Sequence, residues 1–304
     1  MKRITATFLD EITHDIPSQN WGRADWSREF ALYRRIGIDT VVLIRSGYRD
    51  KCVFPAQSVP GLLPVHEDLG RMFLDLAEEH GLTLYWGTFD SGVHWMRQSW
   101  WREVELNRRF LDEVVERYGT SPAFGGWYLA HEAARHENHI VELFRAIGSH
   151  CRSLKDVPVL VSPYPMGTKQ FAAEAAFTLE ETKEHWERIF AEASGSFDVC
   201  AFQDGQIQYS ELEEFHHMVH EIASQHGVTV WTNVESFDRD MPIKFPPADW
   251  RYLRTKMEIA SRYSERLMTF EFAHFMSPHS CYPSARNLFQ RYCEALDVTI
   301  SAND

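Results

Sequence analysis

Short, β-rich apolar runs alternate along the whole chain with longer stretches in which apolar residues recur at helical spacing. There are eight runs, and they begin near Arg3, Thr40, Thr83, Phe124, Val157, Val199, Thr229 and Arg266. Strands that alternate with helical patterns of this length are typical of βα units, in which successive strands lie parallel in one sheet.

One helix is predicted after each strand. The amphipathic stretches cover residues 25–36, 67–80, 100–118, 136–153, 178–194, 209–226, 249–263 and 284–296. Eight βα units predict an α/β fold of the (β/α)8 barrel class, formed as a single domain by residues 1–304. The competing arrangement is a doubly wound open sheet. The sequence does not favour it, because no GxGxxG follows the first strand and no GxxxxGK[ST] occurs.

The predicted loops differ in length between the two ends of this barrel. Connections from helix to strand are short, as at residues 37–39 and 81–82. Connections from strand to helix are long after the first, second, fifth and seventh strands, at about residues 12–24, 47–65, 165–177 and 238–248. Barrel enzymes build their sites from strand-to-helix loops, so we expect the functional site at the carboxyl ends of the strands.

Acidic residues follow most of the predicted strands, where a barrel side chain reaches the central cleft. They are Asp10, Glu11, Asp90, Glu132, Asp204, Glu235, Asp238 and Glu271. Acidic residues are depleted from strands and need a partner or a function when they are half-buried. Any one of them could cap a helix or pair with an arginine, but the set as a whole indicates an acidic site at the barrel mouth.

Glu132 and Glu235 stand out because they end the fourth and seventh strands, on opposed parts of the mouth. Glycoside hydrolysis needs two such carboxylates: one protonates the leaving oxygen, and the other attacks or stabilises the sugar cation. His131 lies beside Glu132, and Asn233 lies on the same strand face as Glu235. The pattern predicts a glycoside hydrolase that acts on an oligo- or polysaccharide.

Three segments also carry a resemblance to a known family: FLDEITHDIPSQNWG at 8–22, GWYLAHE at 126–132 and AFQDG at 201–205. They resemble the DUF4434 family, bacterial barrels expected to be glycoside hydrolases, over nearly the whole chain. The glutamates that end strands four and seven also resemble the catalytic pair of the large clan of retaining-glycosidase barrels. That resemblance implies Glu132 as acid/base and Glu235 as nucleophile, with retention of configuration. His131 stands where the clan usually has asparagine.

Aromatic and polar residues near the strand ends are candidates for binding substrate. Aromatic rings stack on the apolar faces of sugars. The loop aromatics from which at least three are expected to do so are Trp21, Trp26, Tyr48, Trp95, Trp100, Trp101, Tyr164 and Phe237. Polar groups expected to bind hydroxyls or tune the glutamates are Asp10, Glu11, Arg45, Asp90, His131, Gln203, Asp204, Asn233, Glu271 and His274. Arg45 could equally form salt bridges to Asp10 or Glu11.

The composition disfavours two other classes of partner, and a carbohydrate substrate remains the expected one. The net charge is −13, with 31 Lys and Arg against 44 Asp and Glu, which disfavours nucleic acid and anionic membranes. The N-terminal apolar run is too short for a signal peptide, so we expect a cytoplasmic protein. The five cysteines are scattered and form no CxxC motif, which favours free thiols over a disulfide framework. Aromatic residues reach 13%, an unusually high share.

Two other functions remain open at this stage. A metal-dependent sugar isomerase or epimerase would gather ligands from strand ends, and Glu132, Asp204, Glu271 and His274 could supply them. A sugar-binding barrel without catalysis would use the same rim. The HHMVHE segment at 216–221 lacks the HExxH spacing and lies on an outer helix, so no metal or other cofactor is predicted.

Overall fold

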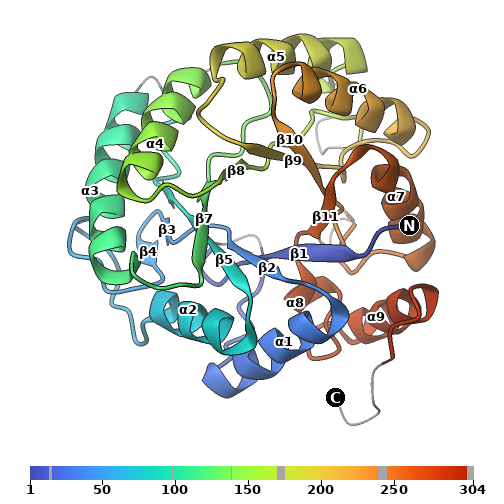
Figure 1. Ribbon diagram of the computed structural model, residues 1–304, viewed down its shortest axis with the longest axis horizontal. Helices are drawn as coiled ribbons and strands as arrows, with labels where there is room; N and C mark the ends of the chain where they lie inside the picture. The colour runs from blue at the N-terminus through green and yellow to red at the C-terminus, as the bar shows by residue number, and fades with distance from the viewer. Residues whose placement is uncertain (14–15, 98, 138, 170–174, 239–244, 300–304) are drawn as a thin grey trace.

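Eight parallel strands close into a barrel in the computed structural model, which describes residues 1–13, 16–97, 99–137, 139–169, 175–238 and 245–299 (Figure 1). The barrel strands are β1 (Ile4–Leu9), β2 (Thr40–Leu43), β5 (Thr83–Gly87), β7 (Phe124–Leu129), β8 (Val159–Val161), β9 (Val199–Gln203), β10 (Thr229–Asn233) and β11 (Arg266–Thr269). Each pairs with the next along the chain, and β1 pairs with β11 to close the ring. The predicted (β/α)8 barrel is confirmed.

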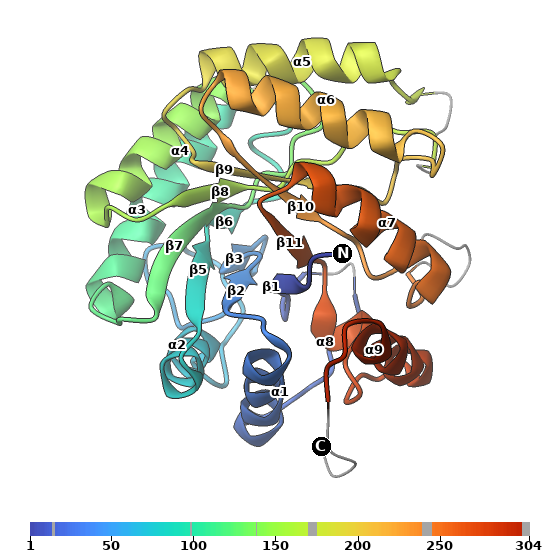
Figure 2. The same cartoon turned by 45° about the vertical axis from the view of Figure 1, so that its right-hand side comes forward.

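Helices surround the strands, as predicted. The long ones are α1 (Arg23–Ile36), α2 (Leu69–His80), α3 (Trp100–Tyr118), α4 (Ile140–Leu154), α5 (Leu179–Glu192), α6 (Leu212–Gln225), α7 (Trp250–Tyr263) and α9 (Pro283–Ala295). Figure 2 shows α5, α6 and α7 outside β9, β10 and β11. None of the described helices is long and apolar enough to cross a membrane.

Strand side chains alternate between the barrel interior and the helix layer, as the two-residue period of a strand requires. Phe8 and Val42 belong to the buried cluster inside the barrel, whereas Leu9 and Leu43 belong to the larger cluster between strands and helices. Tyr85 and Trp231 fill part of the interior with ring centroids 6.1 Å apart. The barrel is therefore a packed core and not an open pore.

A small second sheet, absent from the sequence prediction, covers part of the barrel mouth. It consists of β3 (Gly47–Tyr48), β4 (Lys51–Cys52) and β6 (Phe89–Asp90). β3 follows β2, β6 follows β5, and the two pair in parallel with Tyr48 opposite Asp90. The sheet therefore joins two consecutive strand-to-helix loops.

The sequence suggested that the eighth strand continues through Glu271, but the structure differs. β11 ends at Thr269, and the short helix α8 (Phe272–Phe275) follows. Glu271 caps that helix, because its carboxylate accepts a hydrogen bond from the backbone N–H of Ala273 at 3.0 Å. A capping carboxylate explains the acidic residue in an otherwise apolar run.

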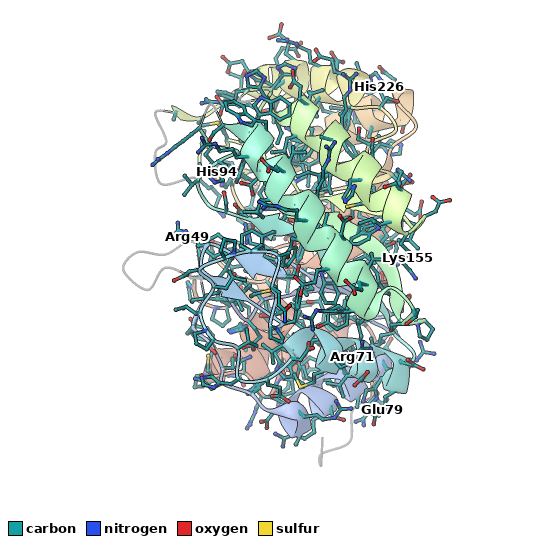
Figure 3. All side chains as sticks on the ribbon, turned by 90° about the vertical axis from the view of Figure 1, so that its left-hand side faces the viewer. Arg49, Arg71, Glu79, His94, Lys155 and His226 are labelled. Atoms are coloured by element: carbon teal, nitrogen blue, oxygen red, sulfur yellow. The ribbon has the colours of Figure 1, made fainter. Side chains whose placement is uncertain are left out.

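The two ends of the barrel carry different loops, as expected. In Figure 3 the strand-to-helix side holds Arg49 and His94, and the opposite side holds Glu79, Lys155 and His226 near the ends of helices. Three of the long loops, 12–24, 165–177 and 238–248, include residues outside the described part of the chain. The remaining long loop, 47–65, contains β3 and β4.

Candidate active site

A cavity of about 230 Å³ lies at the carboxyl ends of the barrel strands. Its walls come from residues that end or follow six of the strands and from the interior residue Phe8. They are Phe8, Ile44, Arg45, Glu132, Tyr164, Gln203, Gln206, Asn233, Glu235, Phe237, Phe245 and Phe270. The cavity therefore brings together Glu132 and Glu235 with five further residues predicted from the sequence: Arg45, Tyr164, Gln203, Asn233 and Phe237.

Glu132 lies three residues beyond β7 and is partly exposed to the cavity, with 23% of its side chain accessible. The Tyr128 hydroxyl donates to its Oε1 at 3.5 Å, and the Arg45 Nη2 lies 3.5 Å from the same oxygen. Two donors on one carboxylate oxygen fix the orientation of the Glu132 side chain.

Glu235 lies two residues beyond β10 and is almost completely buried. Its backbone is held on both sides by a buried ion pair. The N–H donates to Asp204 Oδ1 at 3.1 Å, and the carbonyl accepts from Lys256 Nζ at 2.7 Å. The position of Glu235 at the cavity wall is therefore set by groups behind it.

Arg45 is the cation among the described residues of the cavity wall, and a second carboxylate outside that wall also binds it. Its Nε donates to Asp90 Oδ2 at 3.3 Å. The other oxygen of Asp90 accepts from the Gly92 N–H at 2.8 Å and from Trp95 Nε1 at 2.9 Å. Burial lowers the pKa of Arg45, but Glu132 and Asp90 outweigh this effect and raise it, so the guanidinium stays charged.

His131, the neighbour of Glu132, is 1% exposed and does not belong to the described cavity wall. Its Nε2 lies 3.1 Å from Glu103 Oε1 on α3, and Glu103 also accepts from the backbone N–H and the hydroxyl of Ser91. The His131 ring is therefore held against α3. It anchors the segment that carries Glu132 to α3.

Asp90, Glu103 and His131 lie close enough to one another to hold a metal ion, with possible ligand atoms within 4.8 Å. Their oxygens, however, already accept bonds from Ser91, Gly92, Trp95 and Arg45. A cation at this point would have to displace the Arg45 guanidinium or lie beside it. The donor set fits a hydrogen-bonded network that already contains its positive charge.

The four residues considered for a sugar isomerase are not gathered around one point in the described structure. Asp204 is bound to Lys256 at 2.7 Å. His274 uses one ring nitrogen toward Glu271 and the other toward the Pro17 carbonyl at 2.7 Å. Only Glu132 of the four lines the cavity. The arrangement gives no support to that alternative.

Asp10, Glu11, Glu271 and His274 form a second group, under the loop that follows β1, and the described cavity wall does not include them. Asp10 Oδ1 accepts from the N–H groups of Ile12 and Thr13 at 3.2 and 3.0 Å, and burial raises its pKa. Burial and the charge of Glu271 raise the pKa of Glu11 to about 7. This group is therefore placed to stabilise the loop.

His274 supplies positive charge to this second group. Burial lowers its pKa, but the charge and hydrogen bond of Glu271 outweigh burial, together with the Pro17 carbonyl, and raise it to about 9. The Glu271–His274 pair thus ties α8 to the loop after β1 through Pro17. The predicted contact of these residues with substrate stays a prediction, since none of them lies in the described cavity wall.

Three of the predicted sugar-stacking aromatics, Trp21, Tyr48 and Trp95, make contacts with other side chains of the protein. Trp21 meets Trp26 edge to face at 4.9 Å. Tyr48 is buried beneath the guanidinium groups of Arg45 and Arg49, at 5.4 and 5.0 Å. Trp95 donates to Asp90 and meets the His131 ring at 5.5 Å. Of the predicted loop aromatics, Tyr164 and Phe237 line the described cavity.

The sequence analysis missed five cavity residues: Phe8, Ile44, Gln206, Phe245 and Phe270. The two-residue alternation places Phe8 and Ile44 inside the barrel, and this signal could have found them. Phe237, Phe245 and Phe270 form one aromatic wall, with Phe237 at 4.7 Å from Phe245 and 5.9 Å from Phe270. Their convergence depends on loop conformation, which the sequence pattern does not give.

Fold and site together define a (β/α)8 barrel whose mouth holds two glutamates in one small cavity, the architecture in which many glycoside hydrolases are built. The family model described as "Domain of unknown function (DUF4434)" matches residues 4–282. The chain therefore belongs to the DUF4434 family.

Solved structures agree with this assignment. A protein from Bacteroides thetaiotaomicron described as a putative alpha-L-fucosidase is 42% identical, with a TM-score of 0.95 over 98% of this chain and 94% of that one. An intracellular xylanase from Thermoanaerobacterium saccharolyticum is 10% identical, with a TM-score of 0.51 over 88% and 84%. A GH18 chitinase from Pseudoalteromonas aurantia is 9% identical, with a TM-score of 0.57 over 97% and 100%.

The xylanase and the chitinase show that the chain has a fold used by glycosidases, and at such low identity they show no more than the fold. No curated protein sequence matches the chain closely enough to name a relative.

Proposed function

We propose that this protein is a glycoside hydrolase in which Glu132 and Glu235 carry out the reaction. The observation that supports this most directly is that both glutamates, predicted from the ends of strands four and seven, line one cavity at the barrel mouth. Most glycoside hydrolases cleave the glycosidic bond with two carboxyl groups that flank it.

In the proposed mechanism Glu132 protonates the leaving oxygen while the Glu235 carboxylate attacks the anomeric carbon. The glycosidic bond breaks, and the sugar is held as an ester of Glu235. Glu132, now a carboxylate, then removes a proton from water, which attacks the same carbon and releases Glu235 with overall retention. The anchored backbone of Glu235 suits the nucleophile, since attack requires a fixed oxygen at short range.

The cavity favours a single neutral sugar over a long chain or an acidic sugar. Its volume of about 230 Å³ is below the range of ~300–1,000 Å³ usual for small-molecule sites. Arg45, the cation among the described residues of the cavity wall, is already bound by Asp90 and Glu132 and so offers little charge to a uronate. The substrate would therefore enter by its terminal sugar, with the remainder of the glycan outside.

The aromatic wall of Phe237, Phe245 and Phe270 supports a sugar with an apolar edge. A 6-deoxyhexose such as L-fucose has a methyl group where other hexoses have a hydroxymethyl group, and burying that methyl against phenyl rings is favourable. A relative at 42% identity is described as a putative alpha-L-fucosidase. An α-L-fucoside is accordingly the first substrate to test.

The test is turnover of nitrophenyl glycosides, α-L-fucoside and α-D- and β-D-galactosides among them, by the wild type and by Glu132→Gln and Glu235→Gln. We expect each variant to lose at least about 10³-fold in kcat, as for other paired catalytic groups. Glu116→Gln, on the exposed face of α3, is the matched control and should retain full activity. Unchanged turnover in both site variants would refute the assignment.

The stereochemistry can be tested separately. Proton NMR of the first product should show the anomer of the substrate. Release of the opposite anomer would replace the retaining route by an inverting one, in which Glu235 activates water. Sugar binding without turnover across the panel would support the non-catalytic alternative.

A further inference from the structure

Arg45 is shared between a carboxylate in the cavity and a carboxylate behind it. Its Nη2 lies 3.5 Å from Glu132 Oε1, and its Nε lies 3.3 Å from Asp90 Oδ2. Both partners of this bridge are shielded, since 10% of the Arg45 side chain and 6% of the Asp90 side chain are accessible. Screening by solvent is weak at such positions, so the position of this one cation matters for both carboxylates.

We propose that Asp90 and Arg45 together set the protonation state of Glu132, with Arg45 acting as a positioning residue that Asp90 restrains. The proposal rests on the proposed function of Glu132 as acid/base. An acid/base must hold a proton in the first step and release it before the second. A neighbouring cation favours the carboxylate, and a carboxylate that competes for the cation reduces this effect.

The geometry of Asp90 explains how it can compete for Arg45 without moving. Its Oδ1 is held by the Gly92 N–H and by Trp95 Nε1, which leaves Oδ2 directed at Arg45. β6, which contains Asp90, pairs with β3 close to Arg45 in the chain. The Asp90–Arg45 contact is thus built into the small sheet and does not depend on substrate.

Other titratable groups also face Glu132 and have to be considered. Tyr128 on β7 donates to the same oxygen, and burial raises its pKa, so it stays neutral. Tyr164, after β8, interacts electrostatically with Glu132, and burial also raises its pKa. Glu235 lies on the wall of the same cavity, and Asp10 acts on Arg45 at longer range. Among these groups Arg45 is the one that carries positive charge.

The test uses two variants with opposite expected effects. Arg45→Met removes the cation, so the pKa of Glu132 should rise by at least about one unit. In Asp90→Asn no carboxylate competes with Glu132 for Arg45, so the pKa of Glu132 should fall. Arg45→Lys keeps the charge and should resemble the wild type. Arg49→Met is the matched control, because Arg49 lies over the Tyr48 ring at 5.0 Å and belongs to the same loop.

Two readouts separate this proposal from the proposed function. The first is the alkaline limb of the pH profile of kcat/KM, which follows the acid in the free enzyme. It should move up in Arg45→Met and down in Asp90→Asn. The second is carbon-13 NMR of labelled glutamate carboxyls, with the Glu132 signal identified by its absence in Glu132→Gln. This titration needs no activity.

Opposite shifts in the two variants, with none in Arg49→Met, would establish the proposal. A Glu132 signal that titrates identically in wild type and folded Asp90→Asn protein would overturn it, even where Glu132→Gln is inactive. If Glu132→Gln is fully active while the carboxyl shifts as expected, the proposed function fails and the Asp90–Arg45 effect stands. Asp90→Asn retains the arginine, so the test remains decisive even if Arg45→Met does not fold.

Discussion

Lys256 on α7 reaches through the helix layer to bind Asp204 at the end of β9, with Nζ 2.7 Å from Oδ1. Both groups are buried, with 6% and 0% of their side chains accessible. The same two residues hold the carbonyl and the N–H of Glu235. An ion pair that looks purely structural thus fixes the backbone of a cavity glutamate.

Replacing Lys256 by methionine should destabilise the protein strongly. The change leaves Asp204 as a buried, uncompensated charge, which typically costs about 3–5 kcal/mol. Urea denaturation measures the loss directly. Lys183→Met is the control, because the Lys183–Glu187 pair is exposed with 4.0 Å between its charged atoms, and exposed pairs contribute less than about 1 kcal/mol. Equal losses in the two variants would contradict this view of Lys256.

Gly87 at the end of β5 should not tolerate alanine. An added Cβ would lie 2.1 Å from the Leu43 carbonyl oxygen and 2.7 Å from that of Ile44, and neither backbone group can move without disturbing β2. We expect a loss of at least about 1–3 kcal/mol, the usual cost of overpacking. Gly22→Ala is the control, since no atom lies within 4 Å of its added Cβ. Thermal unfolding of both variants decides the point.

Glu11 should make stability fall with rising pH. Its pKa is raised from 4.5 to about 7 in the folded protein, so the folded state binds more protons between these values. The stability from this group is complete below pH 4.5 and is lost as the pH rises through about 7. Glu11→Gln should therefore match the wild type near pH 4.5 and exceed it by about 2–3 kcal/mol at pH 8. Urea unfolding at both pH values provides the measurement, and a pH-independent difference would argue against a buried Glu11.

His274 should show a different pH dependence from Glu11. Its pKa is raised from 6.5 to about 9, so the stability it contributes is present below pH 6.5 and is lost as the pH rises through about 9. His274→Gln should cost about 2–3 kcal/mol at pH 6 and little at pH 10. His217→Gln on α6, where the histidine and Glu221 are both more than half exposed, provides the comparison. A loss of the same size at both pH values would indicate a packing role instead.

The fold was predictable because one pattern recurs eight times, and each repeat confirms the others. The small sheet was not, because β3, β4 and β6 are two residues long and lie within loops. α8 was hidden for a related reason: Phe272–Phe275 continues an apolar run, and the cap at Glu271 depends on a hydrogen bond rather than on spacing.

The site was predictable where the position of a strand end decides what faces the cavity, as for Glu132, Glu235 and Asn233. The orientation of a side chain was not predictable where a residue on a helix binds it. Asp204 turns to Lys256, which lies 52 residues away, and His131 turns to Glu103, which lies 28 residues away. Sequence spacing gives the position of an acidic residue, but not the cation or donor that the fold places against it.

The small sheet at the barrel mouth also limits how the loops of this protein could change. Arg45 precedes β3 and Asp90 ends β6, and the Arg49 N–H donates to the Asp90 carbonyl at 3.0 Å. Barrel enzymes acquire different chemistries through variation of the loops at the mouth. Here the loops after β2 and β5 form one hydrogen-bonded unit, so a new specificity on this side would have to be acquired, or engineered, by transplanting both loops together.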